Sequence, residues 1–353
     1  MALIYTAALI SQILNPVQHE AHAGLSPVET PRPGLQDEQL LAPMNNPLDP
    51  LAPLIGGQWR PVDLTMLNEY TRYRWGAGER SMLFTTWQAG DDGLDPAAGV
   101  GLFYWDPARE VIAGTTVLDQ GRLKDMIVEV QEGRLDFKHD YYSGGTTSKW
   151  IETFGWDGAD SYQYQAFIIG EAPLEWLNLR CAREEEGASA LPVMPMDEGE
   201  SAKLGALEPM MGNWKVTKTD HRNDSVHESR NIVYWGLDRS VILWRDIANV
   251  DGVDTPVSDA LIYWSPKTSS IELLQVTDSG EVVRASLAEN DEGLFGACET
   301  VTGVEDDQAE GPGSFMTVTF ETDRAGFTIS TWRATEDPER RVAETSIVFE
   351  PFE

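Results

Sequence analysis

The stretch Gly101–Gly121, GLFYWDPAREVIAGTTVLDQG, decides the fold because the chain contains it twice. The second copy, at 260–280, reads ALIYWSPKTSSIELLQVTDSG, and Trp264 follows Trp105 at a distance of 159 residues along the chain. Both copies have an apolar run ending in Trp-x-Pro, a turn, a second run and Asp-x-Gly. Each copy predicts two β-strands and two chain reversals, the second on a glycine that tolerates positive φ. The repeat therefore predicts two related domains.

The similarity continues outside these stretches. A Gly-x-Trp opens the first copy at Gly57–Trp59 and the second at Gly212–Trp214. Short runs rich in β-branched and aromatic residues follow, separated by Gly, Asp, Asn or Pro, as in antiparallel strands joined by tight turns. The first copy predicts strands at 57–62, 70–76, 81–88, 99–106, 109–119, 122–131, 133–142, 147–155, 161–169 and 175–183. We expect an all-β protein of two tandem antiparallel barrels with about eight to ten strands each, because closure hides strand edges; a sandwich is the alternative.

Composition divides the chain into four parts. Residues 1–50 form an N-terminal arm that ends in a Pro-rich linker, and Ala2–Leu14 with Ala21–Ala23 has the form of a signal peptide. No Lys or Arg precedes the apolar run, so an exported (periplasmic or secreted) and a cytoplasmic location both stay open. We expect the first barrel at 51–183, an acidic linker at 184–206 and the second barrel at 207–353.

The charge of the chain narrows the classes of partner. Asp and Glu number 58 against 26 Lys and Arg, which gives a net charge of −32. Such a field repels phosphate backbones and anionic lipids, so we expect no nucleic-acid partner. No run of about 18 apolar residues predicts a membrane span. Only two cysteines occur, Cys181 and Cys298, in different copies, so we expect no disulfide framework.

The two Gly-x-Trp motifs resemble those of the calycin superfamily, the lipocalins and their relatives. With Trp105-Asp106-Pro107 and Asp119-Gln120-Gly121, each copy is similar to a bacterial lipocalin-like family without an assigned activity. The resemblance spans about 51–183 and 207–349, and implies a cup that holds a small apolar ligand. It also implies that Trp59 packs across the barrel floor against an Arg of the last strand. Arg180 fits this place in the first copy, whereas Thr345–Phe349 of the second copy contains no Arg.

One predicted strand, Arg134–Tyr142, indicates where the polar contents of the first cup lie. Charged residues alternate with Leu135, Phe137, His139 and Tyr141, so the charged face points outward and the second face inward. The next two strands alternate in the same way. The ligand-binding residues we predict are those of the inner face that carry polar or indole groups: His139, Tyr141, Trp150, Glu152, Tyr162 and Tyr164.

The second copy carries different residues at the matching positions. Cys298 replaces His139, Val318 replaces Glu152, and Phe327 and Ile329 replace the two tyrosines. We therefore expect the first cup to be polar and the second drier. A buried Glu must be paired or protonated, and a nearby His can pair with it.

These residues support three functions. The first is a soluble lipocalin-like protein that binds a small, largely apolar ligand inside a barrel, more in keeping with the sequence than an enzyme. The second is an isomerase, cyclase or hydrolase that uses Glu152 and His139 as acid and base. The third is a structural pair of filled barrels. None of the five histidines lies on a closing strand as a haem ligand, and His221 and His227 have no third partner, so we expect no cofactor and no metal.

Overall fold

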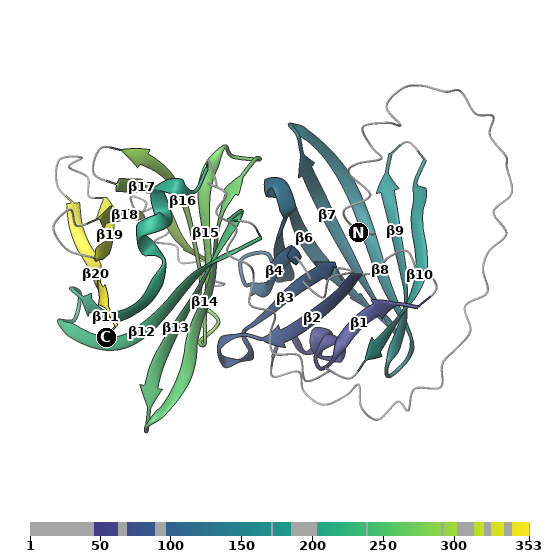
Figure 1. Cartoon of the computed structure of the whole chain (residues 1–353), viewed down its shortest axis with the longest axis horizontal. Coiled ribbons are helices and arrows are strands. Elements are labelled where there is room, and N and C mark those ends of the chain that lie inside the picture. The colour runs from purple at the N-terminus through teal and green to yellow at the C-terminus, as the bar shows by residue number, and fades with distance from the viewer. Residues whose placement is uncertain are drawn as a thin grey trace, which may run out of the picture.

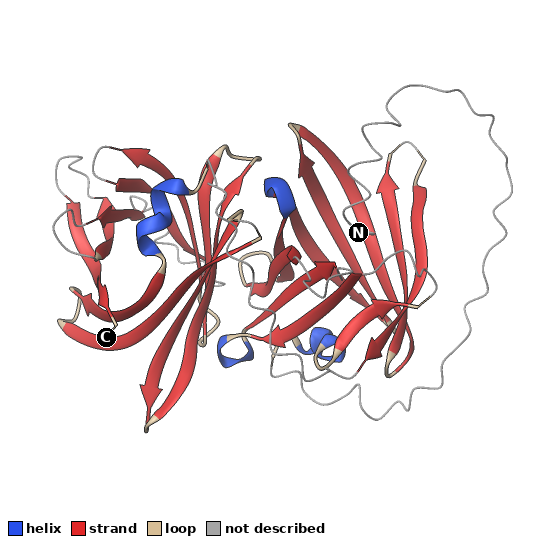
Figure 2. Ribbon diagram, in the orientation of Figure 1, coloured by secondary structure: helices blue, strands red, loops and turns tan. Residues whose placement is uncertain are grey.

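A computed structural model of the chain shows two closed antiparallel β-barrels in tandem, each with ten strands (Figures 1 and 2). The residues that it describes are 46–62, 69–88, 97–170, 172–184, 203–237, 239–290, 293–301, 314–320, 326–334 and 341–352. The all-β prediction is confirmed. Nearly all of the predicted N-terminal arm and most of the predicted acidic linker lie outside the described residues.

In the first barrel every strand pairs with its neighbours in the sequence, and β1 closes the circle against β10. Its strands are β1 (Gln58–Pro61), β2 (Glu69–Trp75), β3 (Ser81–Gln88), β4 (Ala97–Asp106), β5 (Val111–Leu118), β6 (Arg122–Gln131), β7 (Arg134–Ser143), β8 (Thr146–Gly158), β9 (Ser161–Ile169) and β10 (Leu174–Glu184). The ten predicted strands match these, and β3, β6 and β9 have the predicted bounds. The turn residues Gly121, Gly133 and Gly144 have positive φ, which explains why glycine ends these runs.

The second barrel repeats this order, with β11 closing against β20. Its strands are β11 (Gly212–Asp220), β12 (Ser225–Gly236), β13 (Val241–Val250), β14 (Val253–Ser265), β15 (Ser270–Thr277), β16 (Val282–Asn290), β17 (Gly293–Val301), β18 (Ser314–Phe320), β19 (Phe327–Ala334) and β20 (Arg341–Pro351).

A short 3₁₀ helix closes the floor of each barrel. These helices are η1 (Asp49–Leu54) and η4 (Gly205–Met210), and their leucines pack into the barrel cores. The indole nitrogen of Trp59 donates a hydrogen bond to the carbonyl of Leu54 at 2.8 Å, and Trp214 donates to Met210 at 2.7 Å. Each Gly-x-Trp motif therefore places an indole across a barrel floor, as the resemblance implied.

The arginine that covers the first of these indoles is Arg183, and the expectation of Arg180 was wrong. The register pairs Trp59 with Arg183, whose guanidinium carbon lies 4.7 Å from the centre of the indole ring. Arg183 also donates to the carbonyls of Pro53 and Ile55 at the end of η1. Arg180 instead pairs with Asp157 at 2.9 Å.

The barrels pack against each other through the outer faces of β3–β6 and β13–β16 (Figure 1). A turn of the first barrel, η2 (Ala77–Glu79), also contacts β14. There the backbone N–H of Ala77 donates to Asp259 at 2.8 Å, and Arg245 binds the same carboxylate. The remaining 3₁₀ turn, η3 (Asp119–Gly121), joins β5 to β6. The apolar contact and these polar ones fix how the barrels meet.

The interface uses the same positions of both copies. Four residue pairs in its apolar core are each separated by 159 residues, the spacing of the sequence repeat: Leu102 and Leu261, Tyr104 and Tyr263, Val117 and Val276, Leu123 and Val282. Arg284 binds the hydroxyl of Tyr104, and Asp125, at the position equivalent to Arg284, lies near Tyr263. Residues of one patch thus meet the same patch of the other copy, as in a two-fold symmetric dimer.

Candidate functional site

The six residues predicted to face the interior of the first barrel are all buried, with exposed fractions between 4% and 8%. They come from three consecutive strands: His139 and Tyr141 from β7, Trp150 and Glu152 from β8, and Tyr162 and Tyr164 from β9. The alternation of side chains along a strand brings them to one face, and pairing of adjacent strands brings them side by side.

A buried ion pair lies at the centre of this group. The ammonium of Lys124, on β6, donates a hydrogen bond to Oε1 of Glu152 at 2.5 Å, and the hydroxyl of Tyr164 also hydrogen-bonds to this carboxylate. His139 Nε2 lies 3.6 Å from the same oxygen, too far for a hydrogen bond. The residue that pairs with Glu152 is therefore Lys124, and the predicted acid–base pair of His139 and Glu152 lacks a direct hydrogen bond.

Sequence reasoning missed Lys124 because the alternation on β6 is hidden. Its neighbour Leu123 points out of the barrel but is buried against the second barrel. Both faces of this strand segment are thus covered, and period two no longer separates an inner face from an outer one. One signal in the sequence remains: Leu123, next to Lys124, aligns with Val282 of the second copy, and both residues lie on the inter-barrel face.

Burial and the ion pair together set the protonation of these side chains. Burial alone would raise the pKa of Glu152, but the Lys124 ammonium, His139 and the hydrogen bonds outweigh it and hold this pKa below its usual value. Burial, followed by the charge of Lys124, lowers the pKa of His139 to about 3. Burial also raises the pKa of Tyr164 well above its usual value. At neutral pH the site therefore holds a carboxylate, a neutral imidazole and a phenol that can donate.

A cavity of about 90 Å³ lies beside this pair and is partly open to solvent. Its apolar wall includes Phe84, Phe103, Phe137, Phe154 and Leu179. Its polar groups include Lys124, Glu152, Tyr164 and Thr116. The hydroxyl of Thr116 is buried and has no hydrogen-bond partner among the described residues. Further polar groups come from Glu69, Thr71 and Thr86 on β2 and β3. The cavity thus offers an apolar surface with several hydrogen-bonding groups, as small-molecule sites do.

The predicted residues divide into two sets around the cavity. Glu152, Tyr162 and Tyr164 line it. His139, Tyr141 and Trp150 do not line it and pack against one another: the imidazole is parallel to the Trp150 indole at 6.4 Å, and Tyr141 meets that indole edge-on. Arg122 donates to the hydroxyl of Tyr141 at 3.2 Å. This second set forms a layer of packed rings behind the ion pair.

At the matching positions, the second barrel is apolar. Cys298, Met316, Phe327 and Ile329 all belong to its core, and Val283 stands where the first barrel has Lys124. The register gives Met316 as the equivalent of Glu152, because Met316 pairs with Gly296 as Glu152 pairs with Phe137, so the expected match with Val318 was wrong. Both members of the ion pair are therefore replaced by apolar residues in the second copy. This supports the prediction of a drier second cup at these positions.

Elsewhere the second barrel has a polar cluster of its own, so the prediction of a drier interior does not extend to the whole barrel. Asp246 accepts hydrogen bonds from Trp244 at 3.0 Å, from Ser258 at 2.5 Å and from Gln275 at 3.2 Å. Burial raises the pKa of Asp246. The equivalent of Gln275 in the first barrel is Thr116, which lines the cavity. At this position the second barrel thus has the larger polar side chain, Gln275, and the first barrel has the smaller one, Thr116.

Comparison with protein-family models finds no match, and comparison with curated proteins finds none either. Within the described part of the chain, no three His, Cys, Asp or Glu side chains are grouped so that they could hold a metal ion. None of the helices there has the length and apolar character needed to cross a bilayer.

Proposed function

We propose that this protein is a lipocalin-like binding protein that holds a small, largely apolar molecule in the first barrel. The fold is compatible with such a role, since closed antiparallel barrels commonly enclose ligands. The observation that carries the proposal is the cavity that joins phenylalanine side chains to the Lys124–Glu152 pair and Tyr164. The site residues we propose are Glu152, Tyr162 and Tyr164 from the sequence, together with Lys124 and Thr116.

The charge balance of the Lys124–Glu152 pair favours a neutral ligand group beside it, and the one other acidic side chain in the described cavity wall is Glu69. Lys124 and Glu152 neutralise each other at 2.5 Å, and a charged ligand group beside them would bring an unpaired charge into a buried place. The unpartnered hydroxyl of Thr116 can donate to or accept from a ligand, and the Lys124 ammonium has donors beyond the one given to Glu152. An apolar molecule with one hydroxyl or carbonyl group satisfies these conditions.

The size of the cavity limits how the ligand fits. About 90 Å³ is less than the roughly 150 Å³ of an engineered cavity that binds benzene. A larger ligand therefore places only one end beside Glu152 and extends through the open side, or it displaces wall side chains such as Met126 and Leu179. We expect the polar end of the ligand to be the end that enters.

Native mass spectrometry of the protein purified from its source tests this proposal. We expect a co-purifying small molecule in the wild type, and weaker retention in Thr116→Val and Tyr164→Phe, which remove one hydroxyl each at nearly constant volume. Tyr234→Phe is the matched control, because this tyrosine is exposed on the outer surface of the second barrel. A wild-type protein without a bound molecule, or equal retention in all variants, would contradict the proposal.

A further inference from the structure

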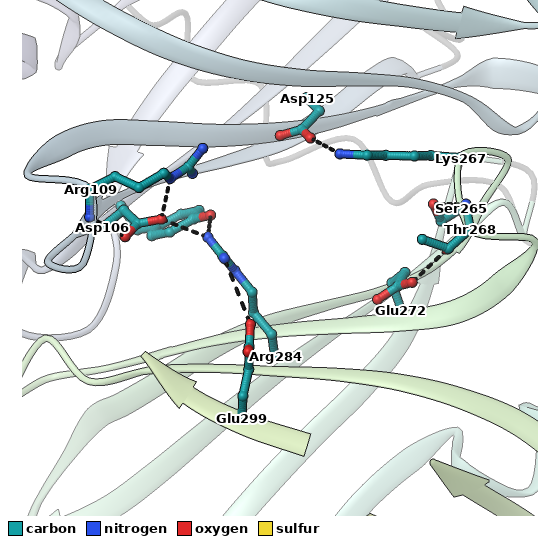
Figure 3. A network of polar contacts seen from close by, with 10 residues as sticks. Asp106, Arg109, Asp125, Ser265, Lys267, Thr268, Glu272, Arg284 and Glu299 are labelled. Atoms are coloured by element: carbon teal, nitrogen blue, oxygen red, sulfur yellow. Dashed lines mark hydrogen bonds and ion pairs between the residues drawn. The ribbon is translucent and has the colours of Figure 1, made fainter. Parts of the chain in front are cut away.

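A second cavity lies between the two barrels, outside both interiors. This inter-barrel cleft has a volume of about 320 Å³, and its walls include Tyr104, Arg109 and Asp125 of the first barrel and Lys267, Thr268 and Arg284 of the second. It thus reaches the range of about 300–1,000 Å³ typical of small-molecule sites, which the cavity of the first barrel does not. Figure 3 shows the polar network around it.

Two arginines from different barrels meet at one carboxylate beside this cleft. Arg109 Nε lies 2.8 Å from Oδ2 of Asp106, and Arg284 Nη2 lies 2.9 Å from the same oxygen (Figure 3). Arg284 also donates to the hydroxyl of Tyr104 at 2.6 Å. The side chain of Asp106 is 1% exposed, so the carboxylate itself is out of reach of solvent. Arg284 Nη1 also lies 3.9 Å from Oε1 of Glu299 (Figure 3), so Arg284 is held by two carboxylates, whereas Arg109 pairs with Asp106 alone.

Arg109 has hydrogen-bond donors left over for a ligand. Arg109 gives its Nε to Asp106, while its Nη1 and Nη2 have no partner among the described residues, and its side chain is 49% exposed. The nearby carboxylates are engaged: Asp125 with Lys267 at 2.8 Å, and Glu272 with the hydroxyls of Thr268 and Ser270. The guanidinium of Arg109 therefore offers a pair of N–H groups next to the cleft.

Arg109 has no role in joining the barrels that would explain its position. The ion pairs across the interface beside the cleft are made by Arg284 with Asp106 and by Lys267 with Asp125. Arg109 binds only within its own turn, three residues after Asp106. Among the charged side chains that line the cleft, the cations Arg109, Lys267 and Arg284 outnumber the carboxylates Asp125 and Glu272, which favours an anionic ligand.

We propose that the inter-barrel cleft binds a small organic monoanion whose carboxylate pairs with Arg109 and Arg284. A planar guanidinium and a carboxylate form two parallel hydrogen bonds, which fixes the orientation of the ligand. The apolar part of the ligand then lies against Leu123 and Leu274. This proposal is independent of the neutral ligand proposed for the interior of the first barrel.

Isothermal titration of the full chain with benzoate, benzamide and inorganic phosphate tests this assignment. We expect saturable binding of benzoate, and about tenfold or more weaker binding in Arg109→Gln, which leaves Asp106 paired with Arg284. We expect the same loss in Thr268→Trp, where the exposed position adds bulk at the cleft. The matched control is Arg222→Gln, since Arg222 is exposed and also pairs with an aspartate close in the sequence, Asp220.

Each outcome decides the proposal. Benzoate binding that weakens in Arg109→Gln and Thr268→Trp but not in Arg222→Gln, with much weaker binding of benzamide and phosphate, supports it. Binding that survives in both cleft variants comes from another place in the molecule and overturns it. Binding of benzamide as tight as that of benzoate rules out recognition of the negative charge. Equally tight binding of phosphate rules out a contribution of the apolar part of the ligand. No saturable binding of benzoate up to about 1 mM also overturns it.

Discussion

The Nζ atom of Lys124 lies 2.5 Å from Oε1 of Glu152 inside the first barrel, and at the equivalent positions of the second barrel the residues are Val283 and Met316. The two side chains are only 5% and 10% exposed. The first barrel thus carries a buried ion pair, and the second barrel has the same fold without an ion pair at these positions. The pair is therefore not required to close a barrel of this kind, which is why we connect it with the cavity beside it.

This relationship predicts how single and double substitutions differ. Lys124→Met or Glu152→Leu alone leaves one buried charge unpaired, so we expect each to lower the free energy of unfolding by about 3–5 kcal/mol. The double variant removes both charges, and we expect it to be within about 2 kcal/mol of the wild type or more stable. Urea unfolding of the four proteins measures this. Additive losses in the double variant would show that the two side chains do not depend on each other.

The buried imidazole predicts a loss of stability in acid. The pKa of His139 is about 3 in the folded protein and about 6.5 in an unfolded chain, so the unfolded state binds more protons between these values. Stability is fully present above pH 6.5 and falls as the pH drops toward 3, and the lowered pKa of Glu152 acts in the same direction. We expect His139 to account for about 2–3 kcal/mol between pH 7 and pH 4.5.

Urea unfolding at these two pH values, compared between the wild type and His139→Gln, isolates this contribution. The pH dependence should be clearly shallower in the variant, whereas His221→Gln, at an exposed hairpin, should keep the wild-type dependence. The same pH dependence in His139→Gln and the wild type would mean that the imidazole is not held neutral inside the barrel.

The floor of the first barrel predicts a large effect of Trp59. Trp59→Ala removes an indole that is 2% exposed and packed under η1, and we expect a loss of about 3–5 kcal/mol. Trp59→Phe keeps most of the apolar area and loses the hydrogen bond to Leu54, so about 1 kcal/mol from that bond adds to a smaller packing loss. Denaturant unfolding measures both. A loss below about 1 kcal/mol in the alanine variant would place the indole outside the core.

The close contact between η2 and β14 predicts that one methyl group added at Gly76 lowers the stability of the protein. A Cβ at Gly76 would lie 2.6 Å from Oδ2 of Asp259 and 2.0 Å from the hydroxyl oxygen of Ser81. We expect Gly76→Ala to lower stability by about 1–3 kcal/mol, because η2 must move away from β14. Gly205→Ala is the control, since a Cβ there meets nothing within 4 Å. Differential scanning calorimetry should show a lower unfolding temperature for the first variant only.

Most of the fold could be predicted from the sequence because it is built from local signals. Alternation of apolar and polar residues and glycine at positive-φ turns located the strands, and the 159-residue repeat showed that the pattern occurs twice. The Arg above Trp59 could not be located in this way. Its identity depends on the register between β1 and β10, which pairs Trp59 with Arg183 and is set by the whole barrel.

The candidate site could be predicted in part. Alternation on β7 and β8 correctly turned His139 and Glu152 inward. Lys124 was missed because packing between the barrels buries the outer face of β6, and such packing leaves no periodic mark in a single strand. The inter-barrel cleft was missed for a related reason. Asp106 and Arg284 lie 178 residues apart in the sequence, and only the docking of the barrels brings them together.

The repeated interface has a further consequence for how the two halves could diverge. In a dimer of identical subunits, any substitution is made on both sides of the symmetry axis at once, so a given position carries the same charge in both subunits. Here one covalent chain carries both halves, and position 125 is an aspartate while its equivalent, position 284, is an arginine. Tandem linkage thus lets one position of the repeat carry opposite charges on the two sides of the interface, which identical subunits cannot do.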